Sequence, residues 1–119
     1  MRLKITNIRE KGDLNKERIV MRVEAPGNVG EFVINQCGFS EGSVTNIIHR
    51  SYWFPDRDVK EGDFVVLYTK HGTNSEKPFK DVTSHFFYWG IGSAIWNTDD
   101  RSAVLMYAPD WEAFKPDQF

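Results

Sequence analysis

The chain has 119 residues, of which 40% are hydrophobic, 27% charged and 14% aromatic, and its formal net charge is −2. This length suits one domain rather than two, and the single cysteine, Cys37, excludes an internal disulfide and with it a disulfide-stapled secreted module. The slightly acidic balance argues against nucleic acid as a partner, because dedicated nucleic-acid binders are usually basic.

The N-terminal segment carries charges but lacks the apolar stretch of a signal peptide. No apolar run approaches the roughly 20 residues that a membrane-spanning helix needs. We therefore expect no membrane partner. The lone cysteine favours a reducing compartment, which points to the cytoplasm.

Alternating apolar and polar residues predict short strands along most of the chain. The first strand is predicted at 3–8, and the second, at 17–24, places Ile19, Met21 and Val23 on one face. Further strands are predicted at 31–36, at 43–54 as one strand or two short ones, at 64–69 and at 82–89, and a corner followed by a strand is predicted at 95–107. The continuous apolar run of 64–69 indicates a central strand that is covered on both faces.

Polar and turn-forming residues separate these strands. The longest polar run, 70–78, predicts a mobile surface loop. Before the last strand, Trp96 is expected to anchor a corner in which Asn and Asp side chains bind turn amides. Pro109 ends that strand, and the tail after it is expected to be partly helical around 111–114 or extended.

The pattern predicts about seven to nine short strands and no long helix, which is typical of an all-β sandwich or barrel. We expect one β-sandwich domain at 1–108, followed by a C-terminal tail at 109–119.

Three segments together resemble the lamin-tail domain family. The segment 52–69 joins an aromatic-Pro turn to a Gly-containing bend and an apolar strand, and Glu31–Asn35 is similar to the first core strand of the family. The run from Trp96 to Leu105 resembles the Trp-Asn-Asn…Asp motif near the end of such domains, although Thr98 and Asp99 depart from its usual Asn and Gly. The likeness spans roughly residues 17–108.

This resemblance implies an immunoglobulin-like β-sandwich that binds other macromolecules and is not an enzyme. We therefore expect a non-catalytic interaction or assembly module, with another protein or a second copy of this chain as its partner.

One alternative is a ligand-binding module for glycan or nucleic acid, centred on the 70–80 loop. Basic side chains gather there in the sequence, and nearby aromatic residues could stack on bases or sugars. The candidate binding residues are Lys70, His71, Lys77 and Lys80, with Tyr52, Trp53, Tyr88 and Trp89 as stacking partners.

The tail supplies a second candidate site. Trp111, Phe114 and Phe119 are apolar residues beyond the last clear strand. They are expected either to fold back and cover an edge of the domain or to dock a partner, because exposed aromatic residues mark interfaces.

Catalytic and metal-binding motifs are not evident in the sequence. The three histidines, His49, His71 and His85, are widely spaced, and no CxxC pair occurs. Ser84 and His85 are adjacent in a predicted strand and point to opposite faces, so they cannot form a dyad with each other. We expect no catalytic residues, no cofactor and no metal.

Overall fold

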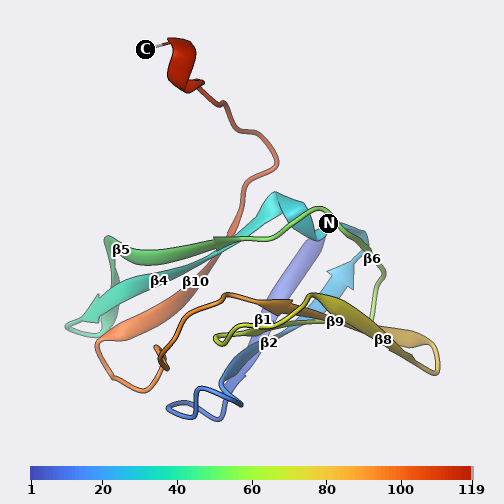
Figure 1. Ribbon diagram of the computed structural model, residues 1–119, viewed down its shortest axis with the longest axis horizontal. Coiled ribbons are helices and arrows are strands. Elements are labelled where there is room, and N and C mark those ends of the chain that lie inside the picture. The colour runs from blue at the N-terminus through green and yellow to red at the C-terminus, as the bar shows by residue number, and fades with distance from the viewer. Residues whose placement is uncertain (119) are drawn as a thin grey trace.

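The computed structural model describes residues 1–118, so the predicted contact of Phe119 lies outside the described residues. The chain is nearly all-β, as expected, and its helical turns are confined to η1 (Val29–Glu31) and η2 (Pro116–Gln118) within the described part (Figure 1). The strands are β1 (Arg2–Arg9), β2 (Arg18–Ala25), β3 (Gly27–Asn28), β4 (Phe32–Ser40), β5 (Ser43–Trp53), β6 (Asp58–Val59), β7 (Phe64–Tyr68), β8 (Ser75–Phe79), β9 (Val82–Tyr88) and β10 (Arg101–Tyr107).

The strands form a five-stranded sheet in the order β1-β2-β7-β9-β8, a three-stranded sheet in the order β10-β4-β5 and a small β3-β6 pair. All neighbouring strands run antiparallel except β7 and β9, which are parallel. Figure 1 shows the three-stranded sheet on one side of the molecule and the five-stranded sheet on the other.

The hydrophobic core lies between the two larger sheets. On β2, the face formed by Ile19, Met21 and Val23 is fully buried, which confirms the predicted alternation. Strand β7 is central in its sheet, as its apolar run predicts, but the expected cover on both faces is wrong, because Phe64 and Tyr68 on its outward side remain partly exposed. Phe32 and Ile34 contribute to the same core from β4, so one core joins both sheets.

Trp96 is buried in this core, as predicted for the corner before β10. The backbone amides of Ile95 and Trp96 are bound by the carboxylate of Glu17 rather than by Asn or Asp side chains of the corner. The corner is therefore held by a side chain almost 80 residues earlier in the chain, at a sequence separation of 78 to 79.

The prediction of a mobile loop across 70–78 is wrong for its second half. Ser75 to Phe79 form strand β8, which pairs antiparallel with β9 at the edge of the five-stranded sheet. Pairing with β9 satisfies the backbone on one side of β8, while its side chains remain exposed on both faces. Strand β8 buries no side chains, and a polar sequence can therefore form it.

The C-terminal tail leaves the end of β10 and runs away from both sheets (Figure 1). Residues 111–114 have no regular secondary structure, so the extended alternative holds and the partly helical one is wrong there. Within residues 1–118, no helix has the length and apolar character needed to cross a membrane.

Candidate functional site

The four basic residues expected to form one loop site are spread over different parts of the five-stranded sheet. Lys80 lies in the turn between β8 and β9, Lys77 pairs with Ser84, and Lys70 follows the end of β7. His71 is exposed next to Lys70. Since β9 alone spans roughly 20 Å at about 3.3 Å per residue, the structure does not bring these side chains to one point.

The aromatic residues predicted to stack near that loop also separate. Tyr52 packs against Phe54 and Trp89 on the core side, while Tyr88 stacks on Tyr68. Burial raises the pKa of the Tyr52 phenol above its usual 10.0, outweighing the hydrogen bond with Asn74 and the nearby charge of Arg57. These rings therefore do not form a single platform beside the lysines.

The tail residue Trp111 contacts the domain. Its ring meets that of Trp53 edge-on, with centroids 5.0 Å apart and an interplanar angle of 87°. Trp111 nevertheless keeps 61% of its surface exposed, and Phe114 keeps 64%. Both candidate tail residues thus remain accessible, and Trp111 is joined to β5 through Trp53.

The three-stranded sheet turns an apolar surface away from the core. Strand register places alternate residues of β4, β5 and β10 on this side, opposite Ile34 and its neighbours. Five large side chains there are 38% to 51% exposed, and we call them the outer apolar face: Phe39, Val44, Ile48, Trp53 and Met106. Trp111 extends this face beyond Trp53.

The remaining positions of the same side are also uncharged. Val33, Cys37 and Val104 lie between the larger side chains, and Cys37 is buried. The Ser51 hydroxyl donates a hydrogen bond to the Asn35 amide oxygen, whereas the buried hydroxyl of Ser102, opposite Cys37, has no hydrogen-bond partner among residues 1–118. An uncharged surface of this kind favours contact with another protein surface.

Strand β5 leaves one edge of this sheet without a hydrogen-bonded neighbour in the described part of the chain. It has 11 residues and contains neither lysine nor proline. The opposite case is edge strand β8, which carries Lys77 and Pro78, two residue types that discourage pairing with another strand. The edge of β5 is therefore the less protected of the two against strand addition.

The signal for this face was present in the sequence but was hidden by an irregular register. Register shifts around Cys37 change the pairing of β4 with β5. As a result, simple alternation along 43–54 does not assign Ile48 and Trp53 to the same side, although the structure places them there.

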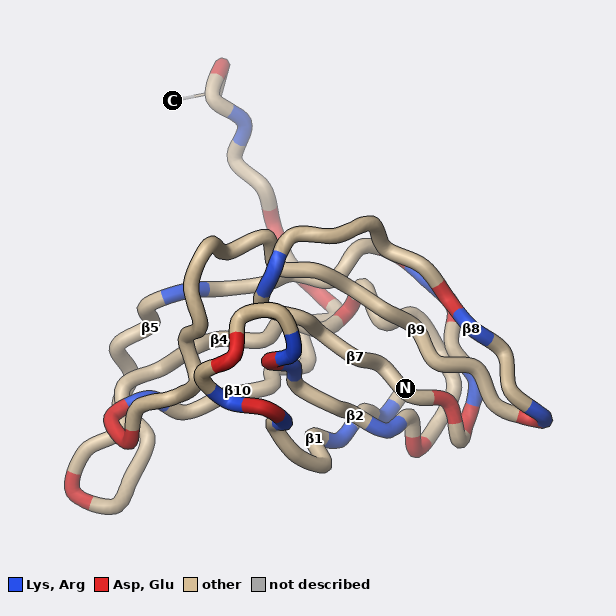
Figure 2. Tube along the Cα trace, turned by 60° about the horizontal axis from the view of Figure 1, so that its bottom comes forward, with Lys and Arg blue, Asp and Glu red and all other residues tan. Residues whose placement is uncertain are grey.

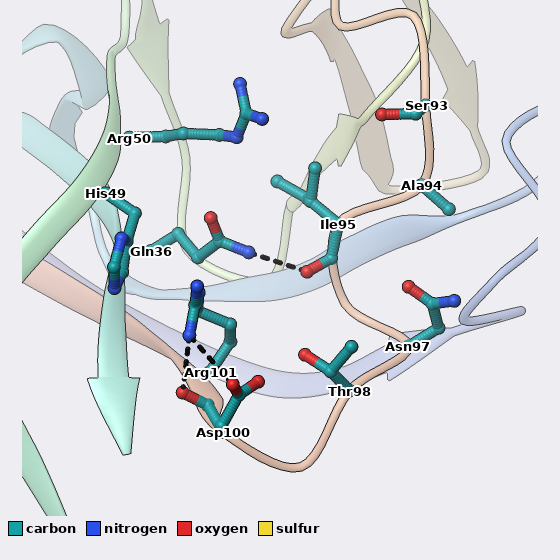
Figure 3. Close-up of a pocket in the computed structure, with 10 residues that line it drawn as sticks. All are labelled: Gln36, His49, Arg50, Ser93, Ala94, Ile95, Asn97, Thr98, Asp100 and Arg101. Atoms are coloured by element: carbon teal, nitrogen blue, oxygen red, sulfur yellow. Dashed lines mark hydrogen bonds and ion pairs between the residues drawn. The ribbon is translucent and has the colours of Figure 1, made fainter.

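A polar groove of about 490 Å³ lies between the end of the three-stranded sheet and the loop before β10 (Figure 3). The Gln36 amide donates a 2.6 Å hydrogen bond to the Ile95 carbonyl and fixes the loop to β4. The hydrogen bond from Thr98 lowers the pKa of the Asp100 carboxyl, and Arg101 at 3.2 Å lowers it further. Most of the side chains that line the groove are polar, so it is suited to water or a small polar group. The lining residues are Gln36, His49, Arg50, Ser93, Ala94, Ile95, Asn97, Thr98, Asp100 and Arg101.

A buried acid–imidazole pair ties the turn before β7 to β9. His85 Nε2 lies 2.9 Å from Asp63 Oδ2, and the amides of Lys60 and Thr83 each donate to Asp63 at 3.0 Å. Burial opposes ionisation of Asp63, but these hydrogen bonds and the His85 charge together hold its pKa below the usual 3.8. The second nitrogen, Nδ1, faces the exposed Glu76 carboxylate at 3.5 Å.

Glu17 is the buried residue that sequence reasoning missed. Its side chain is fully buried, and its carboxylate accepts hydrogen bonds from Gly12 N, Thr69 Oγ1, Ile95 N and Trp96 N. A glutamate at the start of a predicted strand is usually solvated, so composition and alternation gave no indication of this arrangement.

Among residues 1–118, no three His, Cys, Asp or Glu side chains gather closely enough to hold a metal ion. In the comparisons with known proteins, no family model and no curated protein matches this chain. The functional interpretation therefore comes from the residues of the surfaces themselves.

Proposed function

We propose that this chain is a non-catalytic interaction module, an immunoglobulin-like β-sandwich of lamin-tail type, whose outer apolar face pairs with a second copy of the chain. Support for the fold comes from the single core shared by two sheets and from the buried Trp96 in the Trp-Asn corner. The observation that carries the function is the uncharged, exposed side of the three-stranded sheet.

The size of this face suits a pair of copies. Full side-chain areas are on the order of 150–250 Å², so the exposed fractions of the five face residues and Trp111 amount to roughly 600 Å² per copy. Two copies would bury about 1,200 Å², the lower limit of stable interfaces at about 1,200–2,000 Å². We therefore expect a reversible dimer rather than an obligate one.

A second copy also fits the chemistry of the face. In a two-fold pair each residue meets the same surface on its partner, so any charge on the face would meet a like charge. The outer positions of β4, β5 and β10 carry no charged side chain, and this removes that repulsion. The unprotected edge of β5 adds backbone groups that an identical strand can pair with.

The test is sedimentation equilibrium of the full chain across micromolar concentrations. We expect the apparent mass to rise from monomer to dimer with concentration, and Val44→Ser with Ile48→Ser to abolish the rise. Phe79→Ser is the matched control, because Phe79 is an exposed apolar residue at 65% on the other sheet. A parent chain that stays monomeric, or a Phe79 variant that also loses the dimer, refutes the proposal.

A further inference from the structure

The five-stranded sheet turns a different kind of surface away from the core. Strand register aligns its outward residues in rows that cross neighbouring strands. One row runs through Arg9, Arg18, Tyr68 and Tyr88. Another row runs through Lys4, Arg22, Phe64, Ser84 and Lys77.

Uncharged residues lie between these two rows. Lys70, which follows the end of β7, lies beside the first row. The middle row consists of Asn7, Val20, Val66, Phe86 and Ser75. We call the three rows together with Lys70 the basic face. It lies on the opposite side of the core from the outer apolar face, because Ile19 and Leu67 of the same strands point inward.

The basic face has a strong local charge. It contains six cationic residues, although the whole chain has a net charge of −2. Beyond Arg22, the same side of β2 continues into the acidic Glu24, which pairs with Arg2. Figure 2 shows Lys and Arg along β1, β2 and β8, where these rows run. The overall charge therefore conceals an asymmetric distribution, and a local basic stripe is what polyanion binding requires.

None of these six cations forms an ion pair within residues 1–118, although Arg22 borders a surface pocket together with Glu24 and Glu61. Within residues 1–118, the ion pairs formed by Lys or Arg are Arg2–Glu24 and Arg101–Asp100, neither of which involves the basic face. A surface cation without an acidic partner keeps its full charge available for a ligand.

Aromatic rings hold part of the basic face in place. The rings of Tyr68 and Tyr88 are stacked, with centroids 5.2 Å apart and an interplanar angle of 11°. Lys70 Nζ lies 5.1 Å from the Tyr68 centroid, and the Arg18 guanidinium lies 5.8 Å from it. These cation–π contacts limit the rotamers of both side chains, which lowers the ordering cost of binding a ligand.

We propose that the basic face binds the sugar–phosphate backbone of single-stranded nucleic acid. The two cationic rows are about 13 Å apart along the strands, and the four strands β1, β2, β7 and β9 span about 14 Å. This area matches a few nucleotides. Half-exposed Phe64 and Phe86 lie among the cations, where they can contact bases.

The shape of the sheet favours a single strand over other polyanions. Reading a duplex groove requires a protruding helix or ribbon, whereas the basic face is an open sheet surface, which other single-strand binders use. A membrane would require large apolar side chains projecting from the face, and on these rows the apolar side chains are at most half-exposed.

The test is fluorescence anisotropy of a labelled oligothymidylate of about 12 nucleotides with the full chain, at about 50 and 200 mM salt. We expect saturable binding that weakens steeply with salt. Arg18→Gln with Arg22→Gln should weaken binding roughly tenfold or more and lower the salt slope by about 1 to 2. Arg22→Lys should keep nearly the parent affinity, because lysine also binds phosphate as a point charge.

Arg50→Gln is the matched control, because Arg50 is an exposed arginine on the other sheet. Lys4→Gln with Lys77→Gln repeats the test at two exposed positions, in case the Arg18 variant alters the fold. Three results each overturn the inference. These are no retention at low salt, equal loss in the Arg50 control, or binding to phosphatidylserine vesicles but not to the oligonucleotide.

Discussion

Glu17→Gln is the most informative single change, because it keeps the size of the side chain and alters only its hydrogen bonding. The carboxylate has one oxygen facing Thr69 Oγ1 at 2.6 Å and Ile95 N at 2.9 Å. The other oxygen faces Gly12 N at 2.9 Å and Trp96 N at 3.3 Å. Three partners are N–H donors and the fourth is a hydroxyl that donates here, so the two carboxylate oxygens match all four and an amide does not.

The expected loss follows from the groups left unpaired. If the amide nitrogen of glutamine faces Thr69 and Ile95, the Thr69 hydroxyl can turn to accept from it, and only Ile95 N is left without an acceptor. A buried donor without a partner costs about 1–3 kcal/mol, so the free energy of unfolding should fall by roughly that amount. A domain of this length is stable by only about 6–18 kcal/mol, so the loss is a large fraction of the total.

Urea unfolding, followed by tryptophan fluorescence, measures this loss. Glu112→Gln, in the exposed tail, is the matched control and should change the free energy of unfolding by less than about 0.5 kcal/mol. Thr69→Val removes one of the four donors and should cost less than Glu17→Gln. If Glu17→Gln is as stable as the control, the corner is not held by this carboxylate.

Three further predictions concern other parts of the molecule. Because the pKa of Asp63 is lower in the folded chain than its usual 3.8, its contribution to stability is full above about pH 4 and is lost as the pH falls through the folded value. Acid unfolding curves should therefore be shallower for Asp63→Asn than for the parent. Gly72→Ala should lower the free energy of unfolding by about 1–3 kcal/mol in urea, since a Cβ there would clash with the ring of Tyr88, and an unchanged midpoint would contradict this packing. Trp111→Ala should leave thermal stability nearly unchanged but weaken the dimer in sedimentation, because Trp111 mostly extends an exposed surface beside Trp53, and an unaffected dimer would exclude the tail from the contact.

Local alternation was sufficient to predict the strands that cover the core. The buried face of Ile19, Met21 and Val23 follows directly from a period of two. The apolar run of β7 likewise indicates a central strand. These elements are predictable because each buries side chains, and burial leaves a pattern in the sequence.

Features that depend on contacts between distant segments were not predictable in the same way. Strand β8 is polar and contains Pro78, and its existence depends on backbone pairing with β9. The anchoring of Trp96 by Glu17 depends on a contact between residues 79 positions apart. Neither feature has a local signal, because both arise when distant segments meet.

The surfaces were predicted least well, since they depend on strand order. The sequence indicated basic residues around 70–80, but Lys77 lies on the edge strand β8 and Lys70 follows the end of the central strand β7. Register also places Arg18 and Arg22 of β2 on the same side as these lysines. The outer apolar face likewise appears only when β5 is paired with β4.

Hydrogen–deuterium exchange at low and high protein concentration tests the proposed self-association most directly, because it reports both whether copies pair and where. We predict that amide protection rises with concentration in β5 (Ser43–Trp53) and not in β8 (Ser75–Phe79). Protection that does not depend on concentration, or that rises only in β8, would contradict pairing through the outer apolar face.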